Sequence, residues 1–469
     1  MPAVDIDPLS FAIRPPPGET EQARQQRLQR ETDAKLRSNR IDDLLRAERE
    51  ALKRKRGTEA DVKLLLLGQA ESGKSTLQKQ FQLLYTPEKL ETERASWKPV
   101  VYINVLYSIR HILDALDEEE DNAYMSDKSN GDYRRSQKAE LYQRQIYNLK
   151  LRLAPLLSIE ESLAQTLASA GHGLASASRG PLVRTGWQSR RMYSNDDFDE
   201  FDAQIIDDRD PYGQAGVINE AMMVHLFSES AEHVQELWYH PIVRTLIKRR
   251  KIRLEDSREF FLNEIARISS PHYLPSTDDI LRCRLQTLGV AEYVFPINVG
   301  RKTVQWKLYD VGGSRGQRHA WVPFFEDANA IIFLAPISAF DQYLEEDFKI
   351  NRIDDSLQTF TSICANQLLK NVHLVLFLNK IDILQHKLNV GIKVRKYITS
   401  FGNRPNEFHE VSEYFRAHFC QAHRKNSVDH KRALYVHMTS VVDTRTTQDI
   451  ITNVRDSIFR GYLKDTSLV

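Results

Sequence analysis

Residues 62–76 read Val-Lys-Leu-Leu-Leu-Leu-Gly-Gln-Ala-Glu-Ser-Gly-Lys-Ser-Thr, and this stretch decides the fold of the chain. Its first part, Val62–Leu67, is a short apolar run of the kind that forms a buried strand. The second part matches the pattern G-x-x-x-x-G-K-S, in which backbone N–H groups and a helix N-terminus point at phosphate oxygens. The lysine of this pattern neutralises phosphate charge, and its serine holds Mg²⁺. We therefore predict a phosphate-binding loop that contains Gly68, Glu71, Ser72, Gly73, Lys74, Ser75 and Thr76.

More apolar runs of strand length follow further along the chain, separated by segments long enough for helices: Thr303–Tyr309, Ala330–Leu334, His373–Leu378 and Leu434–Met438. This alternation predicts an α/β fold with a mostly parallel sheet. The stretch from about 85 to 275 contains no convincing strand. Its apolar residues recur at helical spacing in five segments: Val100–Leu116, Ala139–Leu157, Ile218–Phe227, Val234–Arg249 and Ser257–Ile268.

Composition excludes several classes of protein. The 469 residues exceed one ordinary domain, and a 41% hydrophobic content is enough for a packed core. A formal net charge of +1 argues against a dedicated nucleic-acid-binding protein. Three widely spaced cysteines form neither a disulfide framework nor a zinc motif. No apolar run approaches the roughly 20 residues of a membrane span, so we expect a soluble intracellular protein.

Three segments differ in composition from the rest. Residues 1–18 are rich in proline and predict a flexible leader. Residues 19–58 predict a charged helix that ends in the basic cluster Lys53–Arg56, either solvated or docked on a partner or an acidic membrane surface. Residues 158–216 change from Ser/Ala/Gly-rich to strongly acidic, and we predict a disordered insertion there.

Two further motifs follow predicted strands and indicate which nucleotide is bound. Asn379-Lys-Ile-Asp382 places a carboxylate where it can accept hydrogen bonds from N1–H and the exocyclic amine of guanine, which adenine lacks. Asp310-Val-Gly-Gly313 places a carboxylate that can orient a Mg²⁺-bound water, beside glycines whose N–H groups can approach a γ-phosphate. Together with the phosphate loop, these motifs indicate GTP or GDP and a nucleotide-sensing switch, and they disfavour a P-loop kinase or ATPase.

In order along the chain, eight segments resemble the α subunits of heterotrimeric G proteins: GQAESGKST (68–76), LEDS (254–257), DDILRCRLQTLG (278–289), DVGGSRGQRHAW (310–321), FFEDANAIIF (324–333), NRIDDSL (351–357), FLNKID (377–382) and TSVVDT (439–444). The similarity covers about 41–116 and 218–469. It implies a divergent member whose Ras-like P-loop GTPase domain, residues 59–88 and 279–469, has a mostly parallel six-stranded sheet. An inserted all-helical domain, residues 89–278, would interrupt it, with the nucleotide in the cleft between the two.

The resemblance also implies roles for individual residues. Ser75 and Thr287 would coordinate Mg²⁺, with Asp310 acting through water. Arg284 would stabilise charge that develops on the γ-phosphate, and Val441 would offer a backbone N–H to the guanine carbonyl. Beyond the phosphate loop, the implied nucleotide-binding set is Asp256, Ser257, Leu281, Arg282, Arg284, Thr287, Asp310, Gly313, Asn379, Lys380, Asp382 and Val441.

Two positions depart from the family pattern where water attacks the γ-phosphate. Ser314 replaces the glutamine that normally orients this water, and a serine side chain is too short to reach the same point. Ala70 replaces a glycine of the phosphate loop, so its Cβ would intrude on the site and strain the loop. Gln317 lies three residues after Ser314, and we expect it to face elsewhere. We predict a GTPase whose catalytic positions are Arg284 and Ser314 and whose hydrolysis is impaired by Ser314 and Ala70, or alternatively a GTP-bound binding module with negligible hydrolysis.

The resemblance implies partners as well. A GDP-bound α subunit associates with a βγ dimer, a heptahelical receptor contacts its C-terminal helix (about Thr447–Lys464), and the GTP form engages an effector; a GTPase-activating protein would supply a group in trans. The family's N-terminal lipidation motif is absent, because Pro2 follows Met1 and no cysteine precedes Cys283. We expect peripheral association with the cytoplasmic face of the plasma membrane, or a cytoplasmic protein.

Overall fold

The structure is a computed structural model that describes parts of 20–43 and then residues 61–130, 137–168, 182–183, 220–249, 252, 256–284, 286–287, 290–299, 302–344 and 346–465. It contains two compact units, Met1–Asp61 and Val62–Val469, and each is described by itself. In the first unit, the described residues between 21 and 43 are helical, and the rest of the predicted helix 19–58 and the leader 1–18 lie outside the described residues.

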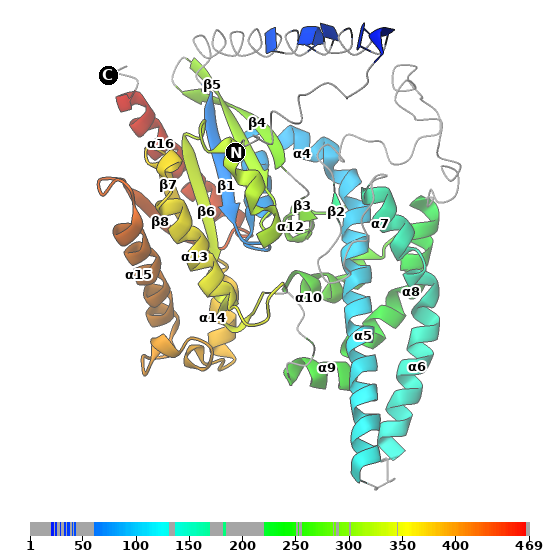
Figure 1. The fold of residues 1–469 in the computed structure, drawn as a ribbon. Helices are drawn as coiled ribbons and strands as arrows, with labels where there is room; N and C mark the ends of the chain where they lie inside the picture. The colour runs from blue at the N-terminus through cyan, green and yellow to red at the C-terminus, as the bar shows by residue number, and fades with distance from the viewer. Residues whose placement is uncertain are drawn as a thin grey trace, which may run out of the picture. The chain divides into compact units, whose positions relative to one another are not determined.

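A six-stranded sheet forms the centre of the second unit (Figure 1), in the order β4 (Val290–Val299), β5 (Lys302–Val311), β1 (Val62–Gly68), β6 (Ala330–Pro336), β7 (His373–Asn379) and β8 (Leu434–Thr439). All neighbours pair in parallel except β4 and β5, which are antiparallel. The prediction of a mostly parallel six-stranded sheet is therefore confirmed. The sequence patterns located every strand except the edge strand β4.

Helices cover both faces of this sheet because side chains of β1 alternate between two cores. Leu64 and Leu66 lie in a core with α3 (Lys74–Tyr85) and α16 (Thr444–Asp465). Leu65 and Leu67 lie in the opposite core, with helices α13 (Arg352–Cys364), α14 (Ile381–Asn389) and α15 (Phe408–Asn426). Short 3₁₀ helices complete the connections: η1 (Arg94–Trp97), η3 (Arg315–Phe324), η4 (Ile337–Asp341), η5 (Gln367–Leu369), η6 (Val394–Lys396) and η7 (Thr399–Phe401).

A third core is built mainly from helices and holds buried residues from Leu90 to Cys283. Its helices are α4 (Pro87–Glu93), α5 (Lys98–Asn130), α6 (Gln137–Leu157), α7 (Glu160–Ala168), α8 (Glu220–Tyr239), α9 (Pro241–Lys248), α10 (Asp256–Asn263), α11 (Ile265–Ile268) and α12 (Thr277–Arg282). The long helices α5, α6 and α8 are seen beside one another in Figure 1. The predicted helical stretch thus builds one core of its own.

Three details of this stretch differ from the prediction. The helices expected at 218–227 and 234–249 are one helix, α8, followed by α9, and the break falls at Pro241 because proline fits the first turn of a helix but not its interior. Helix α7 lies inside the predicted insertion 158–216, where Leu163 and Leu167 are buried, so the expected disorder begins too early. The stretch also contains a short strand, β2 (Leu182–Val183), which pairs in parallel with β3 (Gln286–Thr287).

The remaining residues of the predicted insertion, 169–181 and 184–216, lie outside the described residues. Across the part of the chain that the structure describes, no helix combines the length and apolar character needed to span a bilayer.

Candidate nucleotide-binding site

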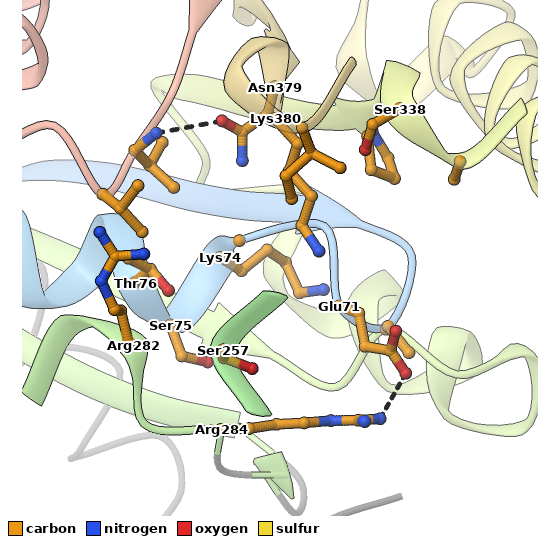
Figure 2. A pocket seen from close by; sticks show the side chains of 18 of the residues that line it. Glu71, Lys74, Ser75, Thr76, Ser257, Arg282, Arg284, Ser338, Asn379 and Lys380 are labelled. Carbon is orange, nitrogen blue, oxygen red and sulfur yellow. Dashed lines mark hydrogen bonds and ion pairs between the residues drawn. The ribbon is translucent and has the colours of Figure 1, made fainter. Parts of the chain in front are cut away.

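A cavity of about 250 Å³ lies at the carboxyl ends of β1, β5, β6 and β7. The carboxyl edge of a parallel sheet is where such folds bind ligands, because several strand-end loops converge there. Most of the predicted site residues line this cavity: Glu71, Gly73, Lys74, Ser75, Thr76, Ser257, Leu281, Arg282, Arg284, Gly313, Ser314, Asn379, Lys380, Asp382 and Val441. Figure 2 shows how they converge from separate segments.

The loop between β1 and α3 needs its glycines for close approach. Gly68 has φ 142°, and a Cβ there would lie 2.4 Å from the carbonyl oxygen of Leu334. Gly73 has φ 101°, and a Cβ there would lie 2.4 Å from Nδ2 of Asn379. Both are positions where only glycine fits without strain. Glu71 is the loop's non-glycine residue in the left-handed region, with φ 62°, whereas Ala70 is not, so the backbone strain predicted at Ala70 is wrong.

Lys74 points its ammonium group into this loop and is almost completely buried. Its Nζ donates to the carbonyl oxygens of Gly68 at 2.9 Å and Gln69 at 2.6 Å. Burial lowers the pKa of Lys74 to about 8, although Asp310 opposes this shift. A buried cation at a helix N-terminus is a strong attractor for phosphate oxygens.

Glu71 lies between two arginines. Arg284 forms an ion pair with it (Figure 2), and Arg352 donates to it at 2.9 Å while also donating to the carbonyl oxygen of Ala70 at 2.6 Å. Burial alone would raise the pKa of Glu71, but the two guanidinium groups hold it well below the usual range. Asn104 of α5 fixes the backbone of Arg284 by accepting from its N–H at 3.2 Å and donating to its carbonyl oxygen at 3.1 Å.

A hydroxyl and a carboxylate meet where Mg²⁺ is expected. Ser75 Oγ donates to Asp310 Oδ2 at 2.7 Å, although the two residues are 235 positions apart. Oxygen donors of this kind suit a hard cation such as Mg²⁺. Among the described residues, no group of three or more His, Cys, Asp or Glu side chains could hold a metal by itself. The backbone of Thr287 lies in β3, but its side chain and that of Asp256 are outside the described residues.

Asn379 joins the two loops at the expected guanine end of the cavity. Its Nδ2 donates to the carbonyl oxygen of Ser72 at 2.7 Å, and its Oδ1 accepts from Thr439 Oγ1 at 3.1 Å and from Val441 N at 3.2 Å (Figure 2). The backbone donor expected to meet guanine, Val441, is thus bonded to Asn379 here. Lys380 adopts a left-handed φ of 65° before α14, and Asp382 follows in the first turn of that helix.

Three predicted residues support the cavity from behind rather than line it. Gly68 and Ser72 belong to the phosphate loop, and Asp310 is buried at the end of β5. Lining residues that the sequence reasoning did not single out include Ser338, Gln342, Arg352 and Lys387. Arg352 could have been found, because it lies within NRIDDSL, a segment already noted as family-like. The others lie outside the motifs: Ser338 is in η4, Gln342 follows it directly, and Lys387 is in α14.

The expectation that Gln317 faces away from the site is wrong. Its side chain lines the cavity, and a Cβ placed on Gly312 would lie 2.1 Å from Gln317 Oε1. The reason is the 3₁₀ geometry of η3, in which the first turn folds back so that Gln317 N donates to Ser314 O at 3.0 Å. Ser314 and Ala70 line the same region of the cavity.

Helix α12 leads directly to Arg284 and depends on one buried carboxylate. Asp279 is fully buried and accepts from Arg267 at 2.9 and 2.7 Å and from Tyr273 OH at 3.0 Å. It also completes a capping box with Ser276 at the start of the helix. This network therefore holds the segment that carries Arg284.

Replacing Asp279 by Ala should lower the free energy of unfolding by about 3–5 kcal/mol, because it leaves a partly buried guanidinium and a buried hydroxyl without their acceptor. Denaturant unfolding followed by circular dichroism measures the loss. The neighbouring Asp278→Ala is the matched control, since Asp278 is exposed and forms an ion pair at 3.2 Å with Arg282 of the same helix. Equal losses in the two variants would contradict this account of α12.

The chain is similar to known proteins along nearly its whole length. The family model of the G-protein alpha subunit matches residues 35–458. The alpha-4 subunit of a guanine nucleotide-binding protein from Mycosarcoma maydis is 30% identical, and the alignment covers 99% of this chain and 96% of that protein. The alpha-1 subunit from the same organism is 29% identical, covering 93% and 97%. Subunit alpha-13 of Mus musculus is 28% identical, covering 93% and 94%.

Proposed function

This chain belongs to the family of G-protein α subunits, and from that premise we propose that it is a receptor-coupled switch that binds GTP and GDP with Mg²⁺ and hydrolyses GTP slowly. A guanine nucleotide-binding signalling subunit follows from the family itself, whose members are generally GTPases. The low rate of hydrolysis, the metal and the individual partners are our proposals. The observation that carries them is the convergence of the phosphate loop, Arg284 and the segment 379–382 on one cavity.

We assign the phosphates to the loop that surrounds Lys74. Its buried ammonium and the N–H groups at the start of α3 would bind the β- and γ-phosphates. Ser75, with Asp310 through water and Thr287, would hold Mg²⁺, which neutralises charge on the phosphate oxygens when bound. Gly313 would approach the γ-phosphate, because a Cβ at this position would lie only 2.4 Å from Lys74 Nζ.

In hydrolysis, Arg284 would stabilise the charge that develops as the γ-phosphoryl group leaves GDP. To do so, its guanidinium would have to turn from Glu71 toward the phosphates. Glu71 would keep its partner Arg352 during this change, so that the loop stays ordered. Ser314, where the family carries glutamine, would not reach the attacking water, and hydrolysis would be slow for that reason.

Nucleotide exchange would then control partner binding. The GDP form would bind a βγ dimer, and a heptahelical receptor would engage α16 and promote exchange. The GTP form would order the segments around Thr287 and Gly313 and engage an effector, with a GTPase-activating protein as a further partner. Peripheral membrane association would rest on these partners and on the basic cluster Lys53–Arg56, which lies outside the described residues.

Asp382 provides the test of guanine recognition. Replacing Asp382 by Asn should weaken GDP binding by about 10²-fold or more, because two charge-assisted hydrogen bonds from the base are lost. The same variant should bind xanthosine diphosphate better than the wild type does, since an amide can donate to the 2-oxo group of xanthine. Equilibrium titration with both nucleotides measures the two changes.

The wild type should also prefer GTP over ATP by a large factor in the same titration. Equal binding of ATP would contradict the proposed function. A second reading, in which GTP is a permanent structural ligand and hydrolysis is negligible, is favoured by Ser314 alone. Nucleotide extracted from purified protein separates the two, because GDP indicates turnover and GTP indicates a permanent ligand.

A further inference from the structure

The cavity retains a carboxamide beside the region where the γ-phosphate is expected. Within the described lining residues, three side chains carry this group: Gln317, Gln342 and Asn379. Gln342 accepts from Arg352 at 3.0 Å, and Asn379 is bonded to Ser72 and Val441. Gln317 is therefore the carboxamide whose side chain has no hydrogen-bond partner recorded among the described residues.

The position of Gln317 is fixed on both sides. Its own N–H donates to Ser314 O at 3.0 Å. The next residue, Arg318, donates to Asp355 Oδ1 at 3.1 Å and to Thr359 Oγ1 at 2.7 Å, both on α13. These contacts hold the first turn of η3 so that the Gln317 side chain folds back over the end of β5.

The carbonyl end of this amide lies beside the glycines. A Cβ on Gly312 would lie 2.1 Å from Gln317 Oε1, and a Cβ on the next residue, Gly313, would lie 2.4 Å from Lys74 Nζ. Gln317 Oε1 is thus close to the glycine pair that borders the buried ammonium. An acceptor at this point can orient a water molecule toward a γ-phosphate held by Lys74.

We propose that Gln317 orients the attacking water in this protein, in place of the side chain at position 314. This inference rests on the proposed function, since it concerns hydrolysis of GTP at that site. Gln317 Oε1 accepts a hydrogen bond from the water, whose oxygen bonds to the γ-phosphorus as the bond to the β–γ bridging oxygen breaks. GDP leaves with the electron pair of the broken bond. One proton of the water passes to a phosphate oxygen and from there to solvent, and Gln317 is unchanged.

Single-turnover cleavage of GTP tests the proposal. Replacing Gln317 by Leu should slow cleavage by about 10- to 100-fold, because the water loses its orienting acceptor. Binding of a non-hydrolysable GTP analogue should be unchanged, since the side chain acts on the water and not on the nucleotide. His319→Ala is the control, an exposed residue of the same 3₁₀ helix, and it should leave the rate unchanged.

A rescue separates a positioning role from a merely structural one. Adding Ser314→Gln together with Ala70→Gly to Gln317→Leu should restore cleavage to at least the wild-type rate, because a glutamine at 314 then has room to supply the same acceptor. Wild-type rates in Gln317→Leu, or no rescue in the triple variant, would overturn the proposal and leave nucleotide binding intact. Absence of any wild-type cleavage would overturn it too, whereas failure of the wild type to bind GTP would instead overturn the proposed function.

Discussion

Single-turnover GTP cleavage should become about 10²- to 10³-fold faster when Ser314 is replaced by Gln and Ala70 by Gly in one protein, because the change restores one positioned transition-state partner, whose loss typically costs such a factor. Ser314 lines the cavity, but a serine side chain is too short to reach the point that a glutamine at this position would reach. A glutamine there adds a carboxamide on a longer, adjustable stem, and the phosphates stay bound by groups that neither change touches.

The Ala70→Gly change is needed for a steric reason. A Cβ on Gly313 would lie 2.6 Å from the backbone nitrogen of Ala70, so the phosphate loop and the end of β5 are already in close contact. Because Ala70 and Ser314 both line the cavity, we expect the Ala70 methyl group to crowd a glutamine placed at 314. The two effects concern one small region, so they should not simply add.

Rapid-quench measurement of phosphate release from preloaded protein gives the rate. The four proteins to compare are the wild type, the two single variants and the double variant. Ser314→Ala is the matched control, because it changes the same side chain without adding a carboxamide, and it should leave the rate near that of the wild type. Cleavage by the wild type at the rate usual for α subunits would contradict this interpretation, as would an unchanged rate in the double variant.

How far the sequence predicts this molecule depends on whether the signal is local. The phosphate loop and the buried strands β1, β6 and β7 are set by consecutive residues, so their presence and approximate bounds were predictable. The edge strand β4 was not found, because buried Phe295 and Ile297 alternate with exposed residues around a proline and the run is not continuously apolar. Helix α7 was missed because it runs directly into a Ser/Ala/Gly-rich stretch whose composition resembles that of a linker.

The candidate site also contains some features that local motifs predict and others that they do not. Motifs predicted lining residues of the phosphate-loop pattern, such as Gly73 and Lys74. They did not predict the direction of Gln317, since that depends on how η3 folds back and on Arg318 reaching α13. Nor did they predict that Asn379 would bond to Ser72 across 307 residues. Side-chain directions set by tertiary contacts are not encoded in any short pattern.

The affinity for GDP should fall by about 10²- to 10³-fold when Lys74 is replaced by Met, because a buried cation facing the phosphates is removed. The chain offers a closely matched control in Lys79, on the same helix. Lys79 is also fully buried, and burial lowers its pKa to about 8 as it does that of Lys74. Its Nζ donates to two carbonyl oxygens, those of Ile280 at 2.7 Å and Cys283 at 3.1 Å.

The two lysines differ in what they face. Lys79 lies 4.4 Å from the centre of the Trp97 ring and bonds to the end of α12, whereas Lys74 lines the nucleotide cavity. Each Met variant loses one buried ammonium and leaves two carbonyl oxygens without that donor, so both should lose some stability in the absence of nucleotide. Only Lys74→Met should lose the rise in melting temperature that GDP produces, because stabilisation by a ligand follows from its affinity for the folded state.

Titration with a fluorescent GDP analogue and thermal unfolding with and without GDP measure both quantities on the same samples. Comparable losses of affinity in Lys74→Met and Lys79→Met would mean that burial of charge in α3, and not contact with phosphate, controls binding. Retained GDP binding in Lys74→Met would mean that the phosphate loop is not part of the GDP-binding site. A large loss confined to Lys74→Met is the expected result. The two lysines are similarly buried and have similarly lowered pKa values, but of the two Lys74 alone lies in the cavity that carries the nucleotide motifs.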